Sequence, residues 1–353
     1  MSRFLKREYT SLEEYTPGEQ PQGRKYVKLN TNESPYPPSE KALAAAQEEL
    51  ARSNLYPDPD CALLKEAIAE HLGLKRENIF IGNGSDEVLS FSFMAFFSHL
   101  PVIFPDISYG FYKVYAELYG CQATFAPLKD DFSIDINDYI GKNSHIVIAN
   151  PNAPTGILLS VSDIEKIIAS NHDKIVLIDE AYIDFGGESA VTLVNKYDNL
   201  IVARTFSKSR SLAGARLGFA AANEAIIRDL EKIKFSTNPY NINRTTLAIG
   251  LGAINDTAYF EECRKKIIEN RDYTSNELKK LGFTMTDSRA NFIFARHNAV
   301  SGEELYLALK EKGVLVRHFD SPRTKDYNRI TIGTREETDI LISKISEILE
   351  EKK

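Results

Sequence analysis

The sequence predicts an α/β fold with a large domain built on a mainly parallel sheet and a smaller α/β domain beside it. Apolar clusters of four or five residues recur along the chain with amphipathic stretches between them, which is the pattern of parallel strands joined by crossover helices. After about Leu251 the sequence predicts a helix-rich stretch that continues without a break until Gly282. The length of 353 residues suits about two domains.

The composition excludes several classes of protein. With 43% hydrophobic and 26% charged residues, the chain is globular rather than disordered. The net charge of -7 and the lack of a basic face argue against a nucleic-acid partner. The N-terminus has no apolar signal region, and no stretch approaches the ~20 apolar residues of a membrane span. We therefore expect neither secretion by that route nor a membrane location.

The cysteines indicate a reducing compartment. Cys61, Cys121 and Cys263 are far apart and show neither CxxC spacing nor a histidine partner. Such an arrangement supports neither a disulfide framework nor a structural zinc site. We expect a cytoplasmic protein without a metal.

The first elements are an extended arm and a strand with a polar end. Proline and asparagine are frequent through Pro38, which favours an arm that wraps the body. A strand over 78–81 is followed by Gly82-Asn-Gly-Ser-Asp-Glu87 and a helix over 88–97. The N-terminus of that helix would present unpaired backbone N–H groups to an anion such as phosphate. A plain glycine turn with a Ser or Asp cap is the alternative, and the segment alone favours it.

The clearest unit of the chain runs from residue 145 to residue 178. A buried strand over 145–149, a rigid loop over 151–156, a helix opened by a capping box of Ser162 and Glu165, and a strand over 175–178 make a βαβ unit. A further strand over 200–203 ends at Thr205-Phe-Ser-Lys208. Ligands of parallel α/β sheets bind beyond the carboxyl ends of the strands, so these loops should meet at one site.

The C-terminal part predicts short strands over 292–295 and 314–317. Its last helix carries a stripe of Leu341, Ile345, Ile348 and Leu349 that should face a sheet. We expect three parts: an N-terminal arm (1–40) that packs with the small domain, a large domain (41–250) and a small C-terminal domain (251–353).

Two side chains at the strand ends stand out chemically. Asp179 follows four apolar residues, where a carboxylate needs a cationic or hydrogen-bonded partner. An acid that reaches solvent at the strand end is about equally compatible with this segment. Lys208 lies among hydroxyls with Arg216 eight residues later, although most lysines are solvated surface groups.

Together the segments resemble the aspartate-aminotransferase-like, fold-type-I enzymes that use pyridoxal 5'-phosphate (PLP), and among them those that act on histidinol phosphate. The resemblance rests on seven motifs in order, namely Leu29–Pro38, Leu55–Pro59, Gly82–Glu87, Asn150–Gly156, Asp179–Tyr182, Arg204–Lys208 and Arg329–Gly333. It covers nearly the whole chain and implies a doubly wound large domain with PLP at its junction with the small one.

The resemblance implies a role for each motif residue. Lys208 would hold PLP as a Schiff base and move a proton, Asp179 would pair with the pyridine nitrogen, and Tyr182 would bond the 3' oxygen. The other cofactor-binding residues it implies are Gly84, Ser85, Asp86, Tyr109, Asn152, Thr205, Ser207 and Arg216, with Tyr109 on the ring face and most of the rest around the phosphate. Tyr56 would reach the neighbouring subunit's cofactor in a homodimer, or else be an ordinary turn tyrosine.

Four residues are implied in substrate binding. Arg329 would grip a carboxylate of glutamate or 2-oxoglutarate, with Arg317, Tyr15 and Asn32 nearby for the phosphate of histidinol phosphate. A strand-end arginine and a surface tyrosine are nearly as compatible with Arg317 and Tyr15.

One departure from the family pattern concerns the 3' oxygen. Where the family reads Asn-Asn-Pro-Thr-Gly, this chain has Ala153 in place of the second asparagine. Alanine cannot donate, so Asn152 or a water takes over, or Tyr182 acts alone.

The implied reaction is ping-pong transamination between glutamate and imidazole acetol phosphate, a step of histidine biosynthesis. An aromatic aminotransferase or a phosphoamino-acid decarboxylase shares every cofactor residue and stays open. A PLP-binding protein without turnover is a third reading, opposed by the presence of both Lys208 and Asp179.

Overall fold

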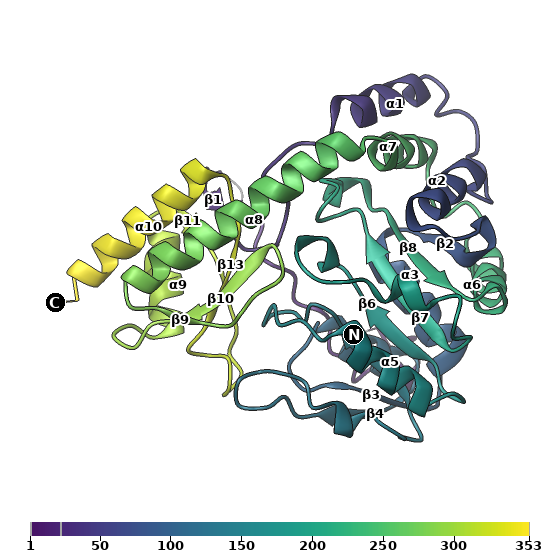
Figure 1. Cartoon of the computed structure of the whole chain (residues 1–353), viewed down its shortest axis with the longest axis horizontal. Helices are drawn as coiled ribbons and strands as arrows, with labels where there is room; N and C mark the ends of the chain where they lie inside the picture. The colour runs from purple at the N-terminus through teal and green to yellow at the C-terminus, as the bar shows by residue number, and fades with distance from the viewer. Residues whose placement is uncertain (1, 22, 353) are drawn as a thin grey trace.

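The chain folds around a large seven-stranded sheet and a smaller four-stranded one (Figure 1). This computed structural model describes residues 2–21 and 23–352. The large sheet has the strand order β2 (Ile79–Gly82), β8 (Gly218–Ala222), β7 (Leu200–Thr205), β6 (Val176–Asp179), β5 (His145–Ala149), β3 (Pro101–Pro105) and β4 (Gln122–Ala126). All neighbours are parallel except β8, which is antiparallel to β2 and β7. The predicted mainly parallel sheet is confirmed.

Helices cover both faces of this sheet, so the fold is doubly wound, as predicted. One face packs against α2 (Ala62–Leu72), α5 (Val161–Ser170) and α7 (Arg244–Asn255), and the other against α3 (Gly84–Ser92), α4 (Phe111–Leu118) and α6 (Glu224–Thr237). Alternate strand residues serve the two faces: Ile79 and Ile81 join one core and Phe80 the other, because side chains alternate along a strand. α1 (Glu40–Leu50) packs on α7.

The smaller sheet lies at the other end of the molecule (Figure 1). Its order is β12 (Arg317–His318), β13 (Asn328–Thr331), β10 (Phe292–Arg296) and β9 (Thr284–Met285). A separate core forms between this sheet and α8 (Thr257–Lys280), α9 (Gly302–Glu311) and α10 (Arg335–Glu350). It includes Leu341, Ile345 and Ile348, with Leu349 packed against it, as the stripe on the last helix predicted.

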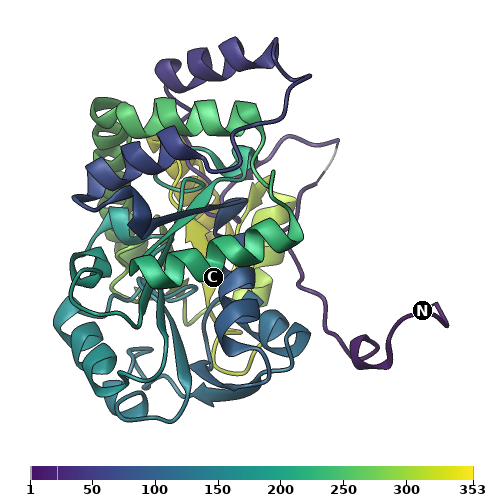
Figure 2. The ribbon, with the colours of Figure 1, turned by 90° about the vertical axis from the view of Figure 1, so that its right-hand side faces the viewer.

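The N-terminal arm lies against the small sheet's end of the molecule. β1 (Val27–Lys28) pairs in parallel with β11 (Val314–Leu315). Thr16 and Pro17 of the arm accept hydrogen bonds from Arg317, while the start of the chain runs outward from the body (Figure 2). The division into parts at residues 40 and 250 stays a prediction. Within the described ranges, no helix has both the length and the apolar character to cross a bilayer.

Three local predictions were wrong in detail. The cap of α5 is Ser160, which accepts from the Asp163 N–H, rather than a box of Ser162 and Glu165. The helix expected over 88–97 begins at Gly84 and changes to a π-helical turn over Phe93–Phe97. The strand expected over 314–317 is two short strands that serve different sheets, because β11 turns away to pair with the arm.

Candidate active site

The carboxyl ends of β6 and β7 and the N-terminus of α3 meet at one edge of the large sheet. β6 and β7 are parallel neighbours, with Asp179 level with Ala203. β2 runs in the same direction because both it and β7 are antiparallel to β8. The loops after these three strands therefore converge, as expected for this class of sheet.

Asp179 is buried and bonded only by neutral donors. Its Oδ2 accepts from the Tyr112 hydroxyl at 2.8 Å and its Oδ1 from the Ala181 N–H at 3.2 Å. Burial raises the pKa of Asp179 to about 6, although these two hydrogen bonds and the charge of Lys208 act in the opposite direction. The result is a carboxylate without an ion-pair partner among the described residues, which favours a cationic ligand group.

In residues 2–21 and 23–352, the Lys208 amine has no carboxylate partner. Its Nζ donates to the Thr31 carbonyl at 3.2 Å and lies 5.9 Å from the centre of the Tyr182 ring. Burial, with help from the positive charge of Arg329, lowers the pKa of Lys208 to about 8. A substantial fraction of the amine is therefore neutral and nucleophilic near neutral pH.

The start of α3 forms a cradle of backbone N–H groups. Gly84, Ser85 and Asp86 are its first residues, and N–H groups in a first helical turn have no partner within the helix. Two glycines keep the cradle open. A Cβ on Gly84 would lie 2.6 Å from Arg216 Nη2, and one on Gly218 would lie 2.4 Å from the Ser85 nitrogen.

Arg216 and Tyr109 both hydrogen-bond to Asp86, in the first turn of α3. Arg216 Nη2 donates to Asp86 Oδ2 at 2.7 Å, and the Tyr109 hydroxyl donates to Oδ1 at 2.9 Å. Arg216 remains about half exposed along its side chain, so its guanidinium keeps donors for a further anion. The hydroxyls of Thr205 and Ser207 lie 2.9 Å apart on the neighbouring loop.

Arg317 and Arg329 are direct partners across the antiparallel pair β12 and β13. Like charges in this arrangement repel. Their recorded hydrogen bonds go to backbone carbonyl oxygens, of Pro17 and Thr16 for Arg317 and of Asn30 for Arg329, and in the described part neither has a carboxylate partner. Two unneutralised arginines side by side predict an anion site.

Tyr15 is placed near these arginines by its aromatic contacts. Its ring stacks on Phe111 at 4.5 Å and meets Tyr109 edge-on at 6.1 Å. Burial raises the pKa of the Tyr15 hydroxyl, and the charges of Arg329 and Arg317 oppose the shift. The arm thus brings a phenol to the site from far away in sequence.

Two of the predicted site residues, Asn152 and Tyr56, make their contacts with residues outside the predicted site. The Asn152 amide donates to the Ile107 carbonyl at 3.0 Å and to Thr155 Oγ1 at 3.1 Å, so both its hydrogens are used. Tyr56 is 76% exposed, and its ring stacks on Tyr240 at 4.5 Å. Within the described residues, its ring contacts reach no other predicted site residue of the same chain.

The sequence prediction missed Tyr112. This fully buried residue of α4 provides the one side-chain hydrogen bond to Asp179 among the described residues. No local pattern marked it, because the contact joins residues 67 positions apart in the sequence. Asn32, expected to contact substrate, donates to the Tyr182 hydroxyl at 2.9 Å, and its contact with substrate stays a prediction.

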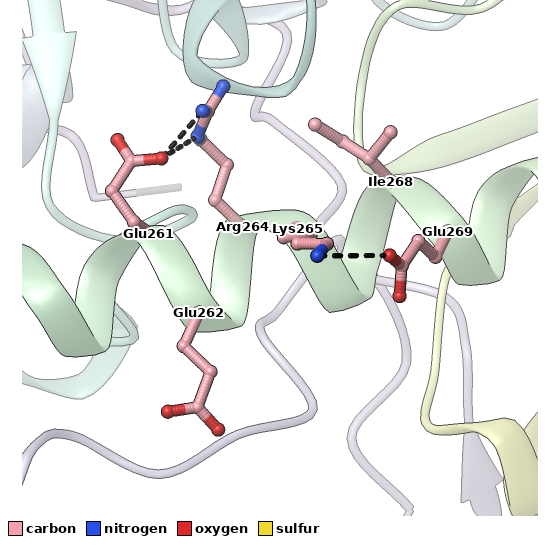
Figure 3. A pocket seen from close by; sticks show the side chains of 6 residues that line it. All are labelled: Glu261, Glu262, Arg264, Lys265, Ile268 and Glu269. Atoms are coloured by element: carbon pink, nitrogen blue, oxygen red, sulfur yellow. Dashed lines mark hydrogen bonds and ion pairs between the residues drawn. The ribbon is translucent and has the colours of Figure 1, made fainter.

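A surface hollow on α8 lies apart from these residues. It measures about 490 Å³ and is lined by six side chains of α8, namely Glu261, Glu262, Arg264, Lys265, Ile268 and Glu269. Figure 3 shows them along one stretch of the helix, with ion pairs from Arg264 to Glu261 and from Lys265 to Glu269. None is a predicted site residue, and the third acid, Glu262, pairs with Lys266 of the same helix. The described residues also contain no cluster of three metal-ligating side chains.

Comparison with known proteins gives a family match over most of the chain. The model of the family described as "Aminotransferase class I and II" matches residues 24–345. A curated protein of Brachyspira hyodysenteriae named histidinol-phosphate aminotransferase is 54% identical over 354 residues, which covers 99% of each chain.

Solved structures agree with the sequence match. The histidinol-phosphate aminotransferase of Clostridium acetobutylicum is 27% identical, with a TM-score of 0.84 over 91% of this chain and 98% of that one. That of Sinorhizobium meliloti, solved in complex with pyridoxal-5'-phosphate, is 24% identical and shares the fold with a TM-score of 0.86 over 93% and 92% of the two chains.

Proposed function

This chain belongs to the class I and II aminotransferases, and on that premise we propose that it is a PLP-dependent enzyme of histidine biosynthesis. It converts L-histidinol phosphate and 2-oxoglutarate to imidazole acetol phosphate and L-glutamate. The observation that carries this assignment is the 54% identity to a histidinol-phosphate aminotransferase over 99% of both chains. Identity at this level over the full length favours this substrate over those of the aromatic aminotransferases and decarboxylases, the alternatives that the motifs left open.

The residues at the strand ends fit PLP. The cradle at the start of α3, with Arg216 beside it, suits the phosphate, and Gly84 and Gly218 leave the space that a Cβ would fill. In the part of the chain that the structure describes, Asp179 is a buried carboxylate without a cationic partner, as a protonated pyridine nitrogen requires. In the same part, Lys208 is a partly neutral amine without an acid partner. Tyr109 is the aromatic side chain assigned to the ring face.

Different side chains of the protein hold the cofactor and transfer the proton in the proposed reaction. When bound, PLP supplies a ring that accepts the electron pair left at the substrate's Cα. Asp179 keeps the ring nitrogen protonated, Tyr182 donates to the 3' oxygen, and the Lys208 amine takes and returns the proton at Cα. The low pKa of Lys208 suits a base that works near neutral pH.

The arginine pair supports the choice of substrates. Both amino donors carry an anionic group, which is a carboxylate in glutamate and a phosphate in histidinol phosphate. This group lies either beside the reacting amine or at the other end of the molecule. Arg329 and Arg317 offer planar donors to either group, and Tyr15 adds a hydroxyl. Asn32 acts on substrate only indirectly in this proposal, since its amide is bonded to Tyr182.

We also propose a homodimer in the cytoplasm. The surface around Tyr56 supports a second copy, because Tyr56, Tyr240 and Leu55 expose large apolar side chains there. In that assembly Tyr56 completes the neighbouring subunit's site. The three cysteines are unpaired, which is typical of a reducing compartment.

The test of the function is a comparison of amino donors. Purified protein with PLP and 2-oxoglutarate is given histidinol phosphate, phenylalanine, tyrosine or phosphothreonine, and glutamate formation is measured. We expect kcat/KM to be at least roughly 100-fold higher for histidinol phosphate than for phenylalanine or tyrosine, since buried donors arranged for a phosphate are left partly unpaired by the smaller carboxylate of these amino acids. A preference for phenylalanine or tyrosine, or carbon dioxide release from phosphothreonine, would displace this assignment.

The low pKa of Lys208 predicts how the cofactor-free protein captures PLP. Only the neutral amine attacks a carbonyl. The capture rate is therefore expected to rise about tenfold per pH unit at acid pH and to level off above about pH 8. Stopped-flow absorbance measures it, with N-acetyl-lysine methylamide as a control whose rate should still rise near its ordinary pKa of about 10.4. A protein profile that rises as far as the control's contradicts the prediction.

A further inference from the structure

Ala153 leaves Tyr182 as the protein's donor to the cofactor's 3' oxygen. Ala153 is buried and packs with Ala290 and Phe292 against Tyr182, and a methyl group cannot donate a hydrogen bond. Asn152 does not replace it, because both its amide hydrogens are bonded elsewhere. The direction of the Tyr182 O–H bond therefore matters more here than in relatives with an asparagine at this position.

Asn32 controls that direction because its amide is held in one orientation. The Thr331 hydroxyl accepts from the Asn32 N–H at 2.9 Å and donates to Asn32 Oδ1 at 3.0 Å. Asn32 is only 1% exposed, so water does not compete for the amide. Its NH₂ group is consequently the part that faces the Tyr182 hydroxyl, at 2.9 Å.

An amide NH₂ group can only donate. The Tyr182 oxygen therefore accepts from Asn32, and the hydroxyl hydrogen is free to point elsewhere. A hydroxyl that accepts one hydrogen bond also becomes a stronger donor in the next. A series of hydrogen bonds thus links Thr331 of the small sheet, Asn32 of the arm and Tyr182 after β6.

We propose that Asn32 is a positioning residue that aims the Tyr182 hydroxyl hydrogen at the 3' oxygen of PLP, in place of the amide that Ala153 lacks. The inference rests on the proposed PLP chemistry. Four charged groups also face Tyr182, namely Arg329 from β13, Asp179 from β6, Asp86 from α3 and Lys208 after β7. The experiment must leave all four in place, so its test variants change only Asn32 and Tyr182.

The readout is the pH midpoint of the absorbance change of bound PLP in the holoenzyme. Donation to the 3' oxygen stabilises its deprotonated form and lowers the midpoint. Asn32→Gly removes the donor and suits the backbone at this position, whose φ is +55°. We expect the midpoint to rise by roughly 0.5 to 1 pH unit, the shift that corresponds to one hydrogen bond.

Asn32→Asp reverses the direction of the bond at nearly constant size. A carboxylate accepts from the Tyr182 hydroxyl and turns its hydrogen away from PLP, so we expect a rise at least as large as for Asn32→Gly. This variant also keeps the test decisive if the glycine variant folds poorly, which a thermal transition would reveal. Asn30→Ala is the matched control: Asn30 is a buried asparagine of the same segment whose amide donates to Glu19, and its midpoint should equal that of the wild type.

A double-mutant cycle shows whether Asn32 acts through Tyr182. In a Tyr182→Phe background, Asn32→Gly should cause no further shift. The inference is overturned if both Asn32 variants titrate like the wild type, or if the glycine variant shifts the midpoint equally in both backgrounds. Wild-type protein that gains no absorbance band with PLP would instead refute the proposed function, so the two failures are distinct.

Discussion

Lys208→Ala is expected to lower kcat for transamination by roughly 10⁴-fold, because the change removes both the covalent attachment and the proton-transferring base. The Lys208 amine is the group that suits both tasks, since it has no carboxylate partner in the described part of the chain and a pKa lowered by burial. Single-turnover measurements with histidinol phosphate would isolate the proton-transfer step from product release. Added methylamine should restore part of the rate, because a small amine can occupy the space of the missing side chain and carry the proton.

Two controls separate this effect from general damage. Lys232 is an exposed lysine of α6, and Lys232→Ala should leave kcat within twofold. Borohydride reduction of the wild-type holoenzyme, followed by peptide mapping, should place the label on Lys208. A label on another lysine, or a Lys208→Ala variant within tenfold of the wild type, would show that the reactive amine is elsewhere.

Local sequence signals were sufficient for the elements that form the site. Runs of buried apolar residues specified β5, β6 and β7, and the polar residues after them marked the edge where ligands bind. The seven motifs supplied the residue roles, which geometry alone would have left open. Asp179 and Lys208 come together because parallel strands share one carboxyl edge, a property that the βαβ pattern already implies.

The contacts that complete the site depend on tertiary packing, which local patterns do not encode. Tyr112 reaches Asp179 across 67 residues and Asn32 reaches Tyr182 across 150, so neither pair follows from spacing along the chain. The pairing of Arg317 with Arg329 depends on the register of two short strands. The capping error at α5 has a local cause, because Ser160 and Ser162 are both competent caps and only the backbone geometry distinguishes them.

Asp179→Asn is the second large effect that we expect, with a fall in kcat of roughly 10² to 10³-fold. The substitution keeps the size of the side chain but removes the negative charge that keeps the pyridine nitrogen protonated, and losing one such electrostatic contact in a water-poor site has effects of this order.

The wild type itself should lose PLP affinity as the pH falls through about 6, the pKa to which burial raises Asp179, because protonation neutralises the carboxylate. The variant has no group that titrates at this position, so its PLP affinity should lack that acid limb. Equilibrium titration of the cofactor-free proteins with PLP from pH 5 to pH 8 measures both.

Tyr112→Phe should give an intermediate result. It removes one hydrogen bond to the ionised carboxylate at 2.8 Å and leaves the charge, so we expect a fall in kcat of roughly tenfold and an acid limb displaced to higher pH, since the lost bond had stabilised the charged form. Tyr139→Phe is a matched control, because Tyr139 is equally buried and its hydroxyl has no hydrogen-bond partner among the described residues. If Tyr112→Phe behaved like Tyr139→Phe in both kcat and the acid limb, Tyr112 would have only a packing role and would not influence the ionisation of Asp179.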